Sequence, residues 1–210
     1  MTYRKLFITC IVASAALISI QTFSQELQRE ITTQREKVRD CDTLYYYGID
    51  LSHVRVTDED KIARSLNYSI VYPSAWIAYV EEELPPYKYV QAKLGKGAFY
   101  YVQKEVQHNT LQVNPNFIIA EDYSFSVDTA YQAVKTYNLT QKSGIGLVLI
   151  AENFNKHHDA SSIWITFFDL KTREVLWAVR LTGNCKHMGY TAHWGSGIVK
   201  GFKRFISNWY

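Results

Sequence analysis

Apolar and polar positions along the chain follow two periods, one typical of strands and one typical of helices. Alternating or continuous apolar runs, rich in β-branched and aromatic residues, predict strands at residues 45–56, 98–106, 146–152, 161–170 and 175–182, and a short strand within residues 111–123. Apolar residues at helical spacing predict helices at residues 57–66, 73–84, 87–94, 126–137 and 193–209. We therefore expect residues 43–210 to form a single α/β domain.

The clearest pattern lies in the C-terminal third. Residues 146–152 (GLVLIAE) form a nearly continuous apolar run, as expected of a central strand that is covered on both faces. Short connections join this strand to the next two, which predicts an antiparallel meander. The fold expected from these patterns is a mixed, largely antiparallel sheet with helices packed chiefly on one face. Its C-terminal part is a three-stranded meander followed by a closing helix.

The first 24 residues have the pattern of a secretory signal peptide. Arg4 and Lys5 precede an uncharged apolar run at residues 6–20, and small residues stand before a cleavage point at Gln25. The run is shorter than the roughly 20 residues of a membrane span, which favours a cleaved signal over an uncleaved anchor. Cys10 lies in the middle of the run, so a hydrophobic signal residue is a better interpretation than a lipid-bearing cysteine. Export is predicted, to the periplasm or the outer-membrane periphery.

Charge and composition exclude some classes of function. Residues 25–42 are polar and charged, which predicts a tether or a frayed helix before the domain. Without residues 1–24 the chain has 21 Lys and Arg against 20 Asp and Glu, a balance that argues against a dedicated nucleic-acid binder. The chain has 16 Tyr and 5 Trp, which either mark binding surfaces or fill strands.

Two cysteines, Cys41 and Cys185, lie outside the predicted signal peptide. In an oxidising compartment such a pair is a candidate disulfide, and two unpaired thiols are the alternative. A bridge across so long a loop would stabilise the fold by roughly 4–5 kcal/mol in the chain-entropy description.

Four histidines are candidates for chemistry. His157 and His158 precede Asp159 between two predicted strands, and His187 and His193 flank a loop near the C-terminus. Imidazoles and carboxylates bind zinc, but adjacent histidines on an extended loop point apart, so a solvated turn is the simpler interpretation. The sequence has no nucleophile elbow, Walker loop, dinucleotide fingerprint or HExxH helix. We therefore predict neither a catalytic residue nor a cofactor.

A basic face is predicted on the closing helix. From Trp177 to the C-terminus there are five basic residues and no acid, and Lys200, Lys203 and Arg204 lie on the helix itself. Such a face can contact anionic phospholipid, lipopolysaccharide or an acidic partner. The alternative is a solvated outer face, which is favourable near a helix C-terminus.

Three segments carry a resemblance to known proteins: residues 163–183 (IWITFFDLKTREVLWAVRLTG), 45–52 (YYYGIDLS) and 143–152 (SGIGLVLIAE). They resemble an uncharacterised family of exported bacterial proteins. The layout is similar to the curli-secretion lipoproteins, the lipoprotein activators of penicillin-binding proteins and the N-terminal domain of the Tol-system propeller protein. This resemblance implies an envelope protein with an α/β domain and carries over no catalytic residue. The chain lacks the lipid-bearing cysteine of the lipoproteins.

Together these observations predict an exported envelope protein that acts as a non-enzymatic interaction or assembly module, with another envelope protein as its partner. The alternative is a small-ligand-binding or metal-binding protein, or a hydrolase, whose site lies in the loops that contain the four histidines.

Overall fold

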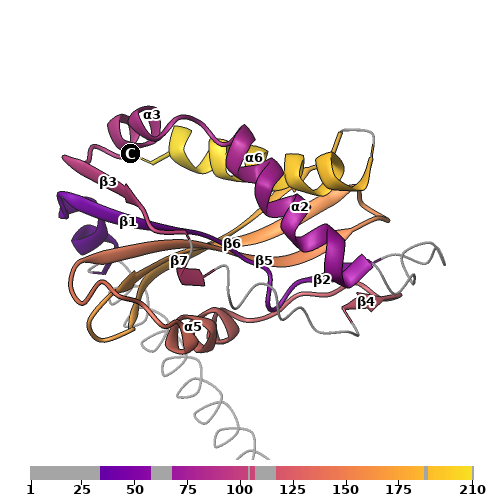
Figure 1. The fold of residues 1–210 in the computed structure, drawn as a ribbon, viewed down its shortest axis with the longest axis horizontal. Coiled ribbons are helices and arrows are strands. Elements are labelled where there is room, and N and C mark those ends of the chain that lie inside the picture. Colours follow the sequence, from indigo (N-terminus) through magenta and orange to yellow (C-terminus); the bar gives the residue numbers. More distant parts are fainter. Residues whose placement is uncertain (1–33, 58–67, 104, 107–116, 187–188, 210) are drawn as a thin grey trace, which may run out of the picture.

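The computed structural model describes residues 34–57, 68–103, 105–106, 117–186 and 189–209 (Figure 1). Its strands are β1 (Thr43–Asp50), β2 (Arg55–Thr57), β3 (Ala98–Tyr101), β4 (Ile118–Ile119), β5 (Ile145–Asn155), β6 (Ala160–Asp169) and β7 (Val175–Asn184). Its labelled helices are α2 (Tyr68–Glu83), α3 (Tyr87–Lys93), α5 (Val127–Thr136) and α6 (Tyr190–Ser207), and residues 34–40 are also helical.

Strand β5 is the centre of one mixed sheet. On one side it pairs antiparallel with β6, which pairs antiparallel with β7. On its other side it pairs parallel with β1 along its first half and with β2 near its end, while β3 and β4 extend β1 and β2 outward. All eleven residues of β5 are buried, which confirms the central strand predicted from its apolar run.

The mixed α/β class and the C-terminal meander are thus confirmed. Among the described strands, however, four of the six pairings are parallel, and the predicted predominance of antiparallel pairing holds only for β5, β6 and β7. The reason is the connection from β1 to β3. It runs through α2 and α3, and such a helical crossover returns the chain in the same direction.

Helices cover both faces of the sheet, unequally. In Figure 1, α2, α3 and α6 lie on one face and α5 lies on the other. The larger core forms under the first three, where the ring of Phe154 packs between Trp76 and Trp194 at centroid distances of 4.9 and 5.7 Å. A smaller core forms between the sheet and α5. The prediction of helices chiefly on one face is therefore confirmed.

Helix α6 approaches β7 closely at two glycines. A Cβ placed on Gly183 would lie 1.9 Å from the carbonyl oxygen of Gly197, a distance no side chain can occupy. Glycine at these two positions therefore lets the helix backbone contact the strand backbone.

The folded part begins upstream of Thr43. The segment predicted as a polar tether contains the helix at residues 34–40, and its Val38 is fully buried in the larger core. The ammonium group of the buried Lys96 donates to the carbonyl oxygens of Val38, Arg39 and Cys41 at 2.6–2.8 Å. A cation at this position satisfies carbonyl groups that a helix C-terminus leaves without partners.

Several predicted boundaries move. The first strand was expected to span residues 45–56, but a turn after Asp50 divides it into β1 and β2. In this turn the carboxylate of Asp50 accepts from the amide of Ser52 at 2.8 Å. Helix α2 begins at Tyr68, and the predicted start, Pro73, lies inside it. Proline is favoured in the first turn of a helix, where its missing N–H is not needed, but Pro73 lies beyond the first turn of α2. Strand β3 ends at Tyr101, well short of residue 106.

Other predictions lie outside the described residues, namely the signal peptide at residues 1–24 and almost all of the helix at residues 57–66. Within the part of the chain that the structure describes, no helix has the length and apolar character needed to cross a membrane.

Candidate functional site

The β5–β6 hairpin places two of the candidate histidines. Its turn is formed by residues 156–159, and Asp159 adopts a positive φ of 44°. The amide of His158 donates to the side-chain oxygen of Asn155 at 3.1 Å, which closes the turn. Both His157 and His158 are exposed, as expected of a solvated turn.

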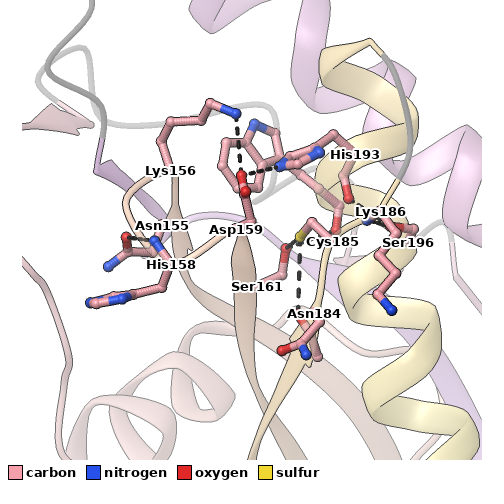
Figure 2. Close-up of polar contacts among 12 residues, drawn as sticks. Asn155, Lys156, His158, Asp159, Ser161, Asn184, Cys185, Lys186, His193 and Ser196 are labelled. Carbon is pink, nitrogen blue, oxygen red and sulfur yellow. Dashed lines mark hydrogen bonds and ion pairs between the residues drawn. The ribbon is translucent and has the colours of Figure 1, made fainter.

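The structure separates the histidines instead of gathering them. Nε2 of His158 lies 3.3 Å from Oδ2 of Asp122, whereas Nε2 of His193, at the start of α6, lies 3.3 Å from Oδ1 of Asp159. Figure 2 shows His158 and His193 on opposite sides of the hairpin. His187 lies outside the described residues. Among the residues that can be described, no three His, Cys, Asp or Glu side chains come together as metal ligands.

The contact between His193 and Asp159 joins the hairpin to α6. Asp159 also lies 3.2 Å from Nζ of Lys156, and this lysine is the main cause that lowers the pKa of the Asp159 carboxyl. The amide of Cys185 donates to the carbonyl oxygen of Asp159 at 2.7 Å (Figure 2). These contacts fix the position of the hairpin relative to α6 and give Asp159 a structural role.

The candidate disulfide between Cys41 and Cys185 is wrong, because both cysteines are free. Cys41 lies three residues before Leu44 in the chain. Leu44 pairs with Ile145, and Ile145 pairs with Asp169 at one end of β6. Cys185 follows the other end of the same strand, about 30 Å away at the rise per residue of a strand. A disulfide requires Cα atoms within about 7 Å.

Neither thiol is arranged as a nucleophile. Cys185 is buried, with its sulfur 3.3 Å from the hydroxyl oxygen of Ser161, which itself donates to the carbonyl oxygen of Trp194 (Figure 2). Burial raises the pKa of the Cys185 thiol, and burial likewise raises the pKa of the Cys41 thiol. A reactive cysteine has the opposite shift, towards the thiolate.

A polar cluster that the sequence patterns did not single out surrounds Glu152. This side chain is fully buried, and its carboxylate accepts from Nε of Arg180 at 2.6 Å, Nε1 of Trp164 at 3.1 Å and the amide of Phe125 at 3.0 Å. Charged side chains are almost never fully buried unless they are paired, and Arg180 supplies the pairing charge.

Residues 121–125 are held over the end of β5 by side chains of the sheet. The amide group of Asn153 donates to the carbonyl oxygen of Tyr123 at 3.0 Å, and that of Asn155 donates to the carboxylate of Asp122 at 2.6 Å. The ring of Phe125 stacks on Trp164 with centroids 6.1 Å apart. The buried amides thus position this segment beside the Glu152 cluster.

Exposed tyrosines gather at another place, on α3 and β3. Of the five exposed large hydrophobic side chains among the described residues, four lie on these two elements and one, Tyr131, lies on α5. The rings of Tyr87 and Tyr101 contact each other edge to face with centroids 6.4 Å apart, and Tyr89 lies on α3 beside a hollow of about 440 Å³. The fourth, Tyr100, stacks on Tyr45 from the other face of the sheet. We call Tyr87, Tyr89, Tyr101 and this hollow the tyrosine surface.

The three basic candidates on α6 lie in two different places. Lys203 is exposed and lines the hollow of the tyrosine surface, together with Pro85, Pro86 and Tyr89. Lys200 and Arg204 instead lie beside the edge strand β7. There they donate to backbone carbonyl oxygens of Asn184 at 3.0 Å and Thr182 at 3.4 Å. Their contacts satisfy backbone groups that an edge strand leaves unpaired.

No protein-family model and no curated protein matches this chain. Among solved structures, the chain is similar to the one titled "LpoB C-terminal domain from Salmonella enterica". The match has 13% sequence identity and a TM-score of 0.31, and it covers 74% of this chain and 96% of that domain. A TM-score this low carries no conclusion about function.

Proposed function

We propose that this protein is an exported, non-enzymatic interaction module of the cell envelope, which binds a partner protein through the tyrosine surface. The proposal rests chiefly on the concentration of exposed tyrosines on α3 and β3, because most other large apolar side chains of the described chain are covered. Tyrosine is enriched in the centres of protein interfaces, where it supplies a large contact area and a polar hydroxyl.

Charge around the tyrosine surface favours an acidic partner. On the Tyr89 side of this surface, Lys88 and Lys93 of α3 are exposed and Lys203 lies across the hollow, whereas the acidic end of α2 lies towards Tyr101. Nζ of Lys93 lies 5.7 Å from the ring centroid of Tyr89, so positive charge borders the aromatic rings directly. We therefore expect the partner to present an apolar centre with acidic residues at its rim.

Export supports an envelope location. It is inferred from the signal-peptide pattern of residues 1–24, and it predicts a mature protein that begins at Gln25 in the periplasm or at the outer-membrane periphery. Fractionation of cells and N-terminal sequencing of the recovered protein test this step. A cytoplasmic protein that retains Met1 would contradict it.

In-cell photo-cross-linking tests the binding surface. A photoreactive amino acid replaces Tyr89 in one variant and Tyr131 in a matched variant, because Tyr131 is an exposed tyrosine far from α3 in the fold. The proposal predicts one discrete adduct from position 89 that is missing at position 131. It also predicts that Tyr87→Ala strongly reduces this adduct.

Two outcomes would overturn the proposed surface. One is an adduct that forms equally from positions 89 and 131. The other is a protein that forms no adduct at position 89 but sediments with vesicles of anionic phospholipid, in a manner that depends on Lys203. The second result would support peripheral contact of the basic face with a membrane, because basic side chains also attract anionic headgroups.

A further inference from the structure

A cavity of about 340 Å³, lined mostly by residues with polar side chains, opens beside the Glu152 cluster at the hairpin end of the sheet. Residues from four parts of the fold contribute to its wall: the segment at residues 121–125, β5 with its hairpin, β6 and β7. The side chains that carry the argument are Asp122, Asn155, His158, Ser162, Arg180 and Thr182. Helix α5 covers the same face of the sheet only farther along, over Val148 and Phe168, which leaves this end open.

The guanidinium group of Arg180 is held in one orientation within this wall. Its Nε is fixed on the buried carboxylate of Glu152, and one terminal nitrogen lies 3.4 Å from the hydroxyl oxygen of Ser162. The side chain is nevertheless 41% exposed. A buried ion pair is weak evidence for stability, since apolar residues of similar size often serve as well. It does preorganise a fork of hydrogen-bond donors at the cavity wall.

The charges of the cavity do not select an anion. The negative charge of Glu152 offsets the positive charge of Arg180. The carboxylate of Asp122 adds a further negative charge beside His158. What remains is a dense set of neutral or balanced hydrogen-bonding groups. The hydroxyls of Ser162 and Thr182, 2.9 Å apart, each donate and accept, and amides and carboxylates add fixed donors and acceptors.

We infer that this cavity binds an uncharged saccharide unit. Each hydroxyl of a sugar both donates and accepts a hydrogen bond, and the wall offers both functions from side chains that the fold already holds in place. Tyr123 also lines the cavity, and the guanidinium group of Arg55 lies 5.4 Å from its ring centroid. The volume suits one or two sugar rings, and both free sugars and glycan chains carry this chemistry.

The first experiment is a titration of the full-length purified protein with cellobiose, N,N′-diacetylchitobiose and maltose, followed by the NMR signal of the Trp164 indole N–H. This group donates to Glu152, which also holds the cavity residue Arg180, so its signal reports on the cluster beside the cavity. Co-sedimentation with insoluble cellulose and chitin is the second arm. Binding of a disaccharide indicates recognition of a free sugar, and binding of the polymer alone indicates recognition of a glycan chain.

Two pairs of variants locate the site. His158→Ala removes a side chain of the cavity wall, and His157→Ala is its matched control because the neighbouring histidine does not line the cavity. Thr182→Val removes a hydroxyl and keeps the side-chain shape, and Thr136→Val is its control at the end of α5. We expect each cavity variant to weaken saccharide binding by about tenfold, the effect of one lost hydrogen bond, and each control to leave it unchanged.

Three results would overturn the inference. The first is that none of the five saccharides binds. The second is binding that is equally strong in the cavity variants and their controls, since the ligand would then lie elsewhere. The third is that inorganic phosphate shifts the Trp164 signal and the neutral sugars do not, which would make this an anion site. Far-ultraviolet circular dichroism of every variant separates lost binding from lost fold.

Discussion

Replacement of Arg180 by methionine should destabilise the fold much more than replacement of Arg204, an exposed arginine on α6. In the wild type the carboxylate of Glu152 is fully buried and Arg180 supplies its counter-charge. Arg180→Met keeps most of the apolar stem but leaves this charge uncompensated. Arg204 is the matched control, because its side chain is exposed and one nitrogen lies 3.4 Å from a backbone oxygen.

The expected magnitude follows from what remains around the carboxylate. Breaking a buried ion pair costs roughly 3–5 kcal/mol. Two donors, the indole N–H of Trp164 and the amide of Phe125, stay in place, and Arg180 is partly solvated, so the lower end applies. We expect about 3 kcal/mol for Arg180→Met. Adding Glu152→Gln removes the charge but keeps an acceptor, so the double variant should be more stable than the single one by about 1 kcal/mol.

Urea unfolding followed by tryptophan fluorescence measures these differences. Arg204→Met should lie within about 0.5 kcal/mol of the wild type, as is usual for exposed positions. The reasoning fails if Arg180→Met has the stability of the wild type. It also fails if the double variant is less stable than Arg180→Met, because the cost would then not arise from an unpaired charge.

Three further outcomes test other parts of the structure. Gly197→Ala should destabilise the fold by more than about 2 kcal/mol in urea unfolding, because its Cβ would lie 2.8 Å from the sulfur of Cys185. Gly201→Ala on the same helix is the control. Its Cβ would make only ordinary contacts, so this variant should be as stable as the wild type or more stable. Intact mass should not change on reduction, and in the native protein Cys41 should be alkylated before the more buried Cys185. Asp169→Asn should be less stable than the wild type at neutral pH but equally stable in acid. Partial burial alone would raise the pKa of this carboxyl, but two backbone amides and a lysine lower it overall, so its contribution to stability is present above about pH 4 and is lost as the pH falls through the lowered value.

The C-terminal half of the fold could be predicted because its signals are local. The run of apolar residues before Glu152 indicated a strand with two covered faces, and the short connections indicated a meander. The short connection between β6 and β7 is a local turn, in which the carboxylate of Asp169 accepts from the amides of Lys171 and Thr172 at 2.9 and 3.0 Å. Patterns with a period of two or 3.6 residues are visible in any short window of the sequence.

The parallel half could not be predicted in the same way. Leu44 pairs with Ile145, about a hundred positions away, and no local pattern specifies which distant strand becomes a neighbour. The same holds for Lys96, whose buried ammonium group holds the helix at residues 34–40. A lysine in a polar loop is expected in solvent, and only tertiary packing reveals the three carbonyl oxygens that it contacts.

The sequence contains a signal for the Glu152 cluster that is not a catalytic motif. Glu152 ends an apolar run and Arg180 interrupts another, in two strands of one predicted meander. Opposite charges within strands expected to be buried indicate a paired, enclosed cluster. The exposure of Tyr87 and Tyr89 had no such signal, because tyrosine is equally common in strands, in cores and at interfaces.

The two proposed binding sites lie far enough apart to be tested independently. Helix α6 begins at the hairpin, where His193 contacts Asp159, and its Ile206 lines the hollow of the tyrosine surface. These two positions on α6 are separated by about 20 Å along the helix axis. Tyr87→Ala should therefore strongly reduce the cross-linked adduct from position 89 and leave the saccharide titration unchanged, and His158→Ala should do the reverse. If either variant lost both activities, the two sites would be coupled through the fold, and neither loss could be assigned to a binding contact.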